Sequence, residues 1–311
     1  MNDVLFTNPI SKLFLNTARG ILSGANGGYI LAYHSIKPDL FVEHINILRP
    51  DRLVSLSEIV ARKVSGKSTK GLFAITVDDG YEDTVPDLCD ICAEKEWPIT
   101  FFPPVDFLNG IVMVAYRLAN LRKYAKGQVI AIEGEEKDFR DEQTWHEYFE
   151  LLQHKMYTLH EREYMHLFDT IADYVISNNI ATRADLYEHP HPVTWDFIAK
   201  KSKNDLLSFQ SHGVTHMPVA GLSDEELAKE CIDSKQKLYE VTGKEVKHFC
   251  YPYGADKCIG TKAQAIVAQH FDSAVTMSRG RIDKADTYML PRIPLYNIDT
   301  KGRTLLKQLT K

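Results

Sequence analysis

An apolar run at residues 72–77, followed directly by Asp78-Asp79-Gly80, constrains the fold of this chain more than any other feature. An uninterrupted apolar run stopped by two acids and a glycine is typical of a buried parallel strand that carries carboxylates at its carboxyl end. Successive side chains on a strand end point in different directions, so one acid can bind a metal while its neighbour faces a substrate as a general base.

Two histidines far downstream, His212-x3-His216, complete a set of metal-binding residue types. Carboxylate oxygen and neutral imidazole nitrogen are ligands that borderline divalent ions such as Zn²⁺ accept. Three protein ligands leave one position for water, as in catalytic zinc sites. The combination predicts a catalytic metal site, although either piece alone would favour a solvated turn or two ordinary loop histidines.

The composition is that of an ordinary globular protein. The chain has 311 residues, of which 44% are hydrophobic and 25% charged, and a net charge of -5. This charge offers no basic surface on average, so we do not expect a nucleic-acid partner. No stretch approaches the ~18 consecutive apolar residues of a transmembrane helix. Peripheral membrane contact through Ile10, Leu13, Phe14 and Leu15 stays open.

The N-terminus and the cysteines indicate a cytoplasmic location. The start of the chain lacks a basic region, a continuous apolar core and a small-residue cleavage site, so we expect no secretion signal. The five cysteines are an odd number and fit reduced thiols better than a disulfide framework. Cys89 and Cys92 share a helical spacing with Leu88, which favours a buried helix face over a redox or zinc pair.

Strands and helices are predicted to alternate along most of the chain, which is the pattern of α/β architecture. Expected strands cover 28–34, 72–77, 99–102, 206–210, 246–251 and 272–276, with an extended run at 290–295; expected helices cover 41–48, 84–95, 223–242 and 261–270. The exception is about 106–190, where helical spacing dominates and no strand is evident. We predict an N-terminal segment, 1–28, and one barrel domain, 29–311, interrupted by this helical insertion.

Three segments resemble the signatures of the polysaccharide deacetylases, also called the NodB-homology or carbohydrate esterase family 4 enzymes. They are Thr76-Val-Asp-Asp-Gly80, Ser211-His-Gly-Val-Thr-His216 and Tyr251-Pro-Tyr-Gly254. The similarity extends over about 29–104 and 190–296. It implies a distorted (β/α) barrel and metal-dependent removal of an N-acetyl, sometimes O-acetyl or N-formyl, group from a sugar.

The resemblance also implies roles for individual residues. Asp78 would be the general base, and Asp79, His212 and His216 would hold the metal. A backbone N–H in the turn Pro252-Tyr253-Gly254 would stabilise the oxyanion and contact the substrate, with Tyr253 matching the family's catalytic position.

Two departures from the family pattern bear on catalysis. The arginine that orients the base in most members is replaced by Cys250, and Arg292 is our candidate for holding Asp78 ionised, with a solvent-facing arginine as the alternative. No histidine follows His270 to serve as the usual late general acid. Tyr33-His34 resembles the early pair of a circularly permuted branch, so we predict His34 as the acid, against a buried core histidine.

The sequence thus predicts a cytoplasmic, metal-dependent deacetylase of an N-acetylated sugar. Zinc is the expected ion, with cobalt, nickel and manganese as alternatives. A nucleotide- or lipid-linked precursor of a surface polysaccharide is the expected substrate. A deformylase or O-acetyl esterase on the same site, and an inactive sugar-binding module, are the alternatives. The sequence indicates neither the sugar nor the oligomeric state.

Overall fold

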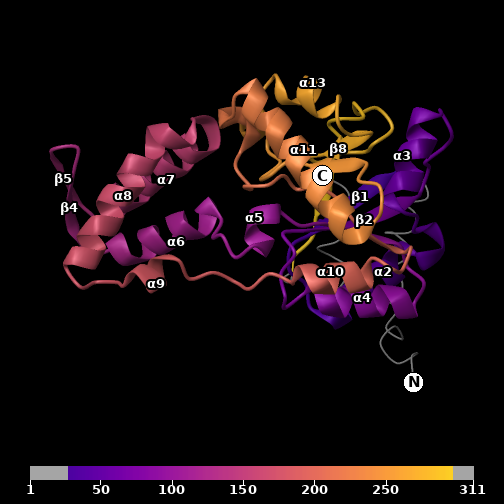
Figure 1. Cartoon of the computed structure of the whole chain (residues 1–311), viewed down its shortest axis with the longest axis horizontal. Coiled ribbons are helices and arrows are strands. Elements are labelled where there is room, and N and C mark those ends of the chain that lie inside the picture. Colours follow the sequence, from indigo (N-terminus) through magenta and orange to yellow (C-terminus); the bar gives the residue numbers. More distant parts are fainter. Residues whose placement is uncertain (1–26, 297–311) are drawn as a thin grey trace, which may run out of the picture.

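The computed structural model describes residues 27–296 and contains a parallel sheet with helices packed around it (Figure 1). The sheet has the order β6-β3-β2-β1-β9, and every neighbouring pair is parallel. Its strands are β1 (Tyr29–Tyr33), β2 (Phe73–Asp78), β3 (Ile99–Phe102), β6 (Leu207–Phe209) and β9 (Ile293–Pro294). All residues of β1, β2 and β3 are buried, as expected of strands covered on both faces.

A second parallel pair, β7 (His248–Cys250) and β8 (Ser273–Val275), lies beside this sheet. Single bridges connect it to the main strands, between Ser211 and Phe249 on one side and between Val275 and Leu290 on the other. The predicted α/β class with a parallel sheet is confirmed. Within residues 27–296 the strands do not form the closed, continuous ladder of the predicted barrel, because the two sheets meet through these isolated bridges.

Most of the helices expected from the alternating pattern are present, and several short ones were not expected. The sheet is surrounded by α2 (Pro38–Leu48), α3 (Leu56–Val64), α4 (Val85–Glu94), α10 (Trp195–Lys201), α11 (Asp224–Thr242), α12 (Asp256–Ile259) and α13 (Ala263–Val267), with 3-10 turns at Pro50–Arg52 and Val219–Gly221. The predicted helix α11 is capped at both ends: Ser223 and Glu226 form a capping box at its start, and Gly243 ends it with a left-handed φ of 65°. Cys89 and Cys92 lie on the buried face of α4 as free thiols.

The segment between β3 and α10 forms a helical body that extends to one side of the sheet in Figure 1, with α5 next to the sheet. It contains α5 (Val105–Leu108), α6 (Val114–Ala125), α7 (Glu142–Thr158), α8 (Glu161–Ser177) and α9 (Arg183–Leu186). It also contains an antiparallel hairpin, β4 (Val129–Ile132) and β5 (Glu135–Asp138), so the prediction that this segment has no strand was wrong. Its helices enclose a hydrophobic core of their own, which includes Leu121, Phe149 and Phe168.

The residues proposed for peripheral membrane contact, Ile10, Leu13, Phe14 and Leu15, lie outside the described part of the chain, as do 1–26 of the predicted N-terminal segment. Within residues 27–296, no helix combines the length and the apolar character that a membrane span needs.

A buried histidine on β7 makes the stability of this fold depend on pH. His248 lies between Ser57 and Ser273, and each hydroxyl oxygen is 2.8 Å from one ring nitrogen. Burial and then the charge of Lys247 lower the pKa of His248 from 6.5 to about 4. The unfolded chain therefore takes up a proton between these two values while the folded chain does not.

We predict that this difference removes about 3 kcal/mol of unfolding free energy as the pH falls from about 6.5 to 4. His248→Gln keeps hydrogen-bonding groups but cannot titrate, so it should lose less stability than the wild type over this window. Urea unfolding at several pH values measures the difference, with the exposed His154→Gln as the control. Equal pH slopes for His248→Gln and the wild type would contradict the prediction.

Candidate metal centre

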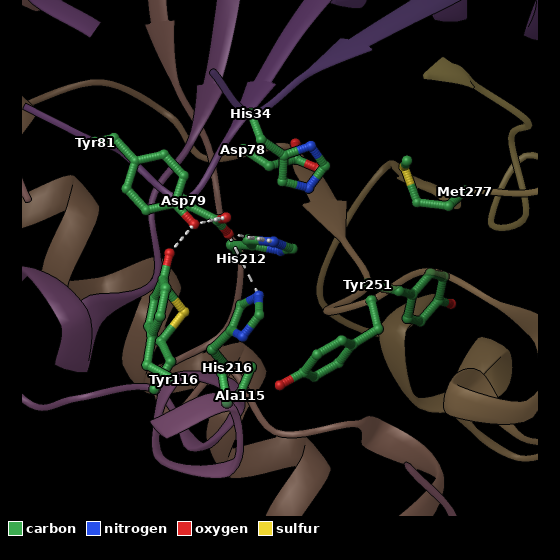
Figure 2. Close-up of a pocket in the computed structure, with 13 residues that line it drawn as sticks. His34, Asp78, Asp79, Tyr81, Ala115, Tyr116, His212, His216, Tyr251 and Met277 are labelled. Atoms are coloured by element: carbon green, nitrogen blue, oxygen red, sulfur yellow. Dashed lines mark hydrogen bonds and ion pairs between the residues drawn. The ribbon is translucent and has the colours of Figure 1, made fainter. Parts of the chain in front are cut away.

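The candidate site lies where the carboxyl ends of β1, β2, β6 and β7 meet (Figure 2). A pocket of about 290 Å³ opens there. Its lining contains His34, Asp78, Asp79, His212, His216 and Tyr253 from the predicted set, together with Tyr81, Met113, Ala115, Tyr116, Ala119, Tyr251 and Met277. Residues that are far apart in the sequence therefore share one cavity. Arg292 lies beneath the pocket, in contact with Asp78.

The two adjacent carboxylates diverge because the backbone turns between them. Asp78 is the last residue of β2, and Asp79 adopts a left-handed φ of 69°. Aspartate tolerates this region better than most residues, although such backbone costs of order 1–3 kcal/mol. His216 and Tyr253 also have left-handed φ values, 58° and 61°. Three of the seven non-glycine residues with positive φ in the described part of the chain therefore lie at the site.

Asp79 faces the two histidines with one carboxylate oxygen. Its Oδ1 atom is 3.6 Å from Nε2 of His212 and 3.4 Å from Nε2 of His216. Oδ1 is buried and has no hydrogen-bond partner among the described residues. Ligand atoms around a tetrahedral ion at ~2.0–2.2 Å lie roughly 3.3–3.6 Å from one another. Both distances from Oδ1 therefore fit the spacing of metal ligands, and the ligand atoms of all three residues lie within 4.8 Å of one another.

The hydrogen bonds of His212 favour the tautomer that a metal requires. Its Nδ1 atom is 2.7 Å from the carbonyl oxygen of Cys250, which can only accept, so Nδ1 carries the proton. The lone pair of a neutral ring is then on Nε2, which faces Asp79. A backbone carbonyl that orients a ligating histidine in this way is a common feature of metal sites. The residues present fit a divalent ion.

A second group of potential ligands, Asp78, His212 and Cys250, also lies close together. It is a poor alternative, because the Arg292 guanidinium already occupies it, with Nη2 3.1 Å from Sγ of Cys250. Burial raises the pKa of Cys250, which keeps the thiol protonated, whereas thiolate is the form that binds metal. The set of Asp79, His212 and His216 is therefore the better candidate.

Arg292 binds Asp78 with two parallel hydrogen bonds. Nη1 donates to Oδ1 and Nη2 donates to Oδ2, both at 2.7 Å, and the arginine is fully buried. Thr76 and the carbonyl oxygen of Thr276 accept further hydrogen bonds from the same guanidinium, at 2.9 and 2.8 Å. Burial is the largest single effect and acts to raise the pKa of Asp78, but the charge and the hydrogen bonds of Arg292, with smaller contributions from nearby side chains, together outweigh it and hold the pKa below its ordinary value. Arg292 thus does not face solvent, and Asp78 stays ionised.

His34 lies at the rim of the pocket beyond the end of β1. Its Nε2 atom is 3.7 Å from Oδ2 of Asp78, and its side chain is 40% exposed. This location differs from that of a core histidine and leaves the imidazole accessible to a bound molecule. The catalytic roles assigned to His34, Asp78, Arg292 and Tyr253 stay predictions.

The turn after β7 places Tyr253 against the candidate metal-binding residues. Its ring centroid is 4.9 Å from that of His216, and its buried hydroxyl has no partner among the described residues. The Gly254 N–H donates to the carbonyl oxygen of Pro252 at 2.7 Å, so the Tyr253 N–H is the donor that this turn can offer a ligand. A side chain at Gly254 would meet the backbone nitrogen of Met277 at 2.6 Å, which explains the glycine.

Two residues that contribute hydrogen bonds to the candidate site were not predicted from the sequence. Tyr81 donates a hydrogen bond to Oδ2 of Asp79 at 2.5 Å, and Glu230 accepts hydrogen bonds from the backbone of Val214 and Thr215, between the two histidines. Tyr81 follows the Asp-Asp-Gly segment directly, which was the available signal. Glu230 lies in the middle of α11, where a single acid gives no signal in the sequence.

The fold and the site together define a candidate metal centre at the carboxyl edge of a parallel α/β sheet. A family model described as "Polysaccharide deacetylase" matches residues 170–270, which include both histidines and the Tyr253 turn but not Asp78 and Asp79. No curated protein matches the chain by sequence.

Solved structures of deacetylases share the fold. The deacetylase PplD of Streptococcus pyogenes, solved with acetate, is 15% identical with a TM-score of 0.55, over 91% of this chain and 98% of that one. IcaB of Ammonifex degensii is 14% identical with a TM-score of 0.56, over 92% and 98%. A de-N-acetylase of Aggregatibacter actinomycetemcomitans is 15% identical with a TM-score of 0.55, over 90% and 99%. The predicted resemblance to the polysaccharide deacetylase family is confirmed.

The Arg292–Asp78 pair yields a prediction about stability. Arg292→Met should lower the free energy of unfolding by about 3–5 kcal/mol, because it leaves the Asp78 carboxylate buried without its cation. The loss should be smaller when Arg292→Met is made in an Asp78→Asn background, where no charge is left behind. Chemical denaturation of the four proteins measures both losses. The same loss in both backgrounds would show that the pair is not coupled.

Proposed function

We propose that this protein is a metal-dependent hydrolase that removes the N-acetyl group from an N-acetylated sugar. The observation that carries the proposal is the arrangement at the end of β2: Oδ1 of Asp79 faces two imidazoles without a hydrogen bond, beside an Asp78 carboxylate held by Arg292. The family match and the shared fold of deacetylases support the same reaction.

The proposal includes the distorted barrel of this family. The five-stranded sheet and the β7–β8 pair would form its wall. The single bridges between Ser211 and Phe249 and between Val275 and Leu290 would connect the two sheets. Active sites of barrel enzymes lie at the carboxyl ends of the strands, and the pocket lies at those ends here. Residues 29–311 would then be one catalytic domain, with the helical body as an insertion in one loop.

Asp79, His212 and His216 would hold the ion, with zinc proposed ahead of cobalt, nickel and manganese because of the nitrogen and oxygen ligands. A divalent ion bound there would polarise the acetyl carbonyl and make a water molecule more acidic. The protein's own side chains would supply binding, orientation and the movement of protons.

Asp78 would take a proton from the attacking water as general base. Arg292 donates a hydrogen bond to each carboxylate oxygen of Asp78. The Asp78 carboxylate therefore has one orientation, at the bottom of the pocket. Because Arg292 helps to hold the pKa of Asp78 low, Asp78 is ionised at neutral pH, which is the form that a general base needs. Water adds its oxygen to the acetyl carbon, and the Tyr253 N–H would donate to the oxygen of the former carbonyl.

His34 would complete the reaction as general acid. The amine is a poor leaving group, so the C–N bond breaks only when the nitrogen receives a proton. His34 lies on the open side of Asp78, where Nε2 can reach a bound molecule. Acetate and the free amino sugar are the products, and the proton taken up by Asp78 balances the one given by His34.

The size of the pocket fits one acetylated sugar unit. Its volume of about 290 Å³ lies at the lower end of the ~300–1,000 Å³ of ligand pockets. We propose a sugar linked to a nucleotide or lipid carrier as the substrate and the cytoplasm as the location. A mass-spectrometric screen of carrier-linked N-acetyl sugars for loss of one acetyl group tests the substrate.

The central test of the reaction separates the base from the metal ligands. Asp78→Asn should keep the metal content of the wild type and lower turnover by about 10²–10⁴-fold, because only the proton acceptor is lost. Metal analysis and an acetate-release assay measure the two effects. Wild-type turnover in this variant would rule out Asp78 as the base.

The same assays decide between the alternatives. Formate release, or acetate release from esters only, would identify a deformylase or an O-acetyl esterase. Purified wild-type protein that retains no divalent ion and releases neither acid would be a sugar-binding module.

A further inference from the structure

We infer that the helical insertion positions the metal-binding carboxylate through a chain of two tyrosine hydroxyls, from Tyr116 through Tyr81 to Asp79. Tyr81 and Tyr116 are positioning residues in this account, since they act through Asp79. The inference rests on the proposed function, because it presupposes that Asp79 binds the ion.

The chain is continuous in the structure (Figure 2). Tyr116, on helix α6 of the insertion, donates a hydrogen bond to the Tyr81 hydroxyl at 2.7 Å, and Tyr81 donates to Oδ2 of Asp79 at 2.5 Å. Each hydroxyl has a single hydrogen to donate, so the direction of the chain is fixed by the carboxylate, which can only accept. The insertion thereby reaches the metal site through hydrogen bonds.

Aromatic packing holds both tyrosines in place. Phe107, on α5 at the start of the insertion, lies with its ring centroid 5.8 Å from that of Tyr81 and 6.5 Å from that of Tyr116. The contact with Tyr81 is edge to face and the contact with Tyr116 is stacked, which are the favoured arrangements of aromatic pairs.

The two ends of the insertion also hold the two loops that carry the ligands. At its start, the backbone N–H groups of Val105 and Asp106 donate to the carbonyl oxygens of Gly213 and Val214, in the loop between the two histidines. At its end, residues 191–193 bond to residues 80–82, just after Asp79, with N–O distances of 2.8 and 2.9 Å. The insertion thus contacts every loop that supplies a ligand.

The hydroxyl chain decides which oxygen of Asp79 is free to bind an ion. Tyr81 occupies Oδ2, which leaves Oδ1 directed at Nε2 of His212 and of His216. Without the Tyr81 hydroxyl, Oδ2 would be a buried carboxylate oxygen lacking its donor, and the carboxylate would lose its single orientation. Removal of such an outer partner typically weakens metal binding by about 10–100-fold.

The experiment compares Zn²⁺ affinity in tyrosine-to-phenylalanine variants, by competition with a chromophoric chelator. Tyr81→Phe keeps the ring packing and should raise the Zn²⁺ dissociation constant by about 10–100-fold. Tyr116→Phe should cause a smaller increase in the wild-type background and none in the Tyr81→Phe background, because it acts only through Tyr81. This double-mutant cycle distinguishes a chain from two independent packing effects.

Tyr148→Phe is the matched control. Its hydroxyl is buried in the same insertion and has no hydrogen-bond partner among the described residues, so its removal changes packing alone. It should leave the Zn²⁺ dissociation constant unchanged. Melting temperatures of all variants show whether the insertion stays folded.

The outcomes separate this inference from the proposed function. Tight Zn²⁺ binding by the wild type with equal affinity in Tyr81→Phe would overturn the hydroxyl chain and leave the deacetylase proposal intact. Equal losses in Tyr148→Phe and Tyr116→Phe, or additive losses in the double variant, would also overturn the chain. A wild type that binds no Zn²⁺ would overturn the proposed function itself.

Discussion

Two adjacent carboxylates are buried at the end of β2, and the need to compensate their charge determines how the surrounding residues are arranged. Asp78 and Asp79 are 1% and 5% exposed, and burying an unpaired carboxylate is costly. Arg292 compensates Asp78 from below with two hydrogen bonds. Asp79 has Tyr81 on one oxygen and two imidazoles opposite the other. A divalent ion among Asp79, His212 and His216 would compensate the charge of Asp79 directly.

This charge balance also explains how Asp78 is paired without the arginine expected at Cys250. Arg292 lies just before β9, and its guanidinium donates a hydrogen bond to Asp78. The same Nη2 atom also donates to the sulfur of Cys250. A small, neutral thiol at position 250 leaves room for a side chain that comes from another strand. Asp78 therefore has an arginine partner, although this arginine comes from a different part of the chain than position 250.

The sequence predicts those parts of the molecule that depend on neighbouring residues. The buried run of β2, the capped helix α11 and the two histidines of one loop all have local signals, and they lie where they were expected. The hairpin was missed because β5, Glu135–Asp138, is largely exposed and contains no apolar residue. The contact of Tyr116 with Tyr81 was missed because it joins the insertion to the sheet over 35 residues, and no local pattern encodes such a meeting. The sequence predicted a barrel, but within the described residues the two sheets are connected by single bridges between distant strands, which no local pattern encodes.

The most direct test of the central claim is the position of the ion in crystals grown with Zn²⁺. An anomalous difference map at the zinc edge should show one strong peak among Oδ1 of Asp79, Nε2 of His212 and Nε2 of His216. The Arg292 guanidinium should remain on Asp78 in the same crystals. A peak among Asp78, His212 and Cys250, or no peak near Asp79, would contradict the assignment of the metal centre.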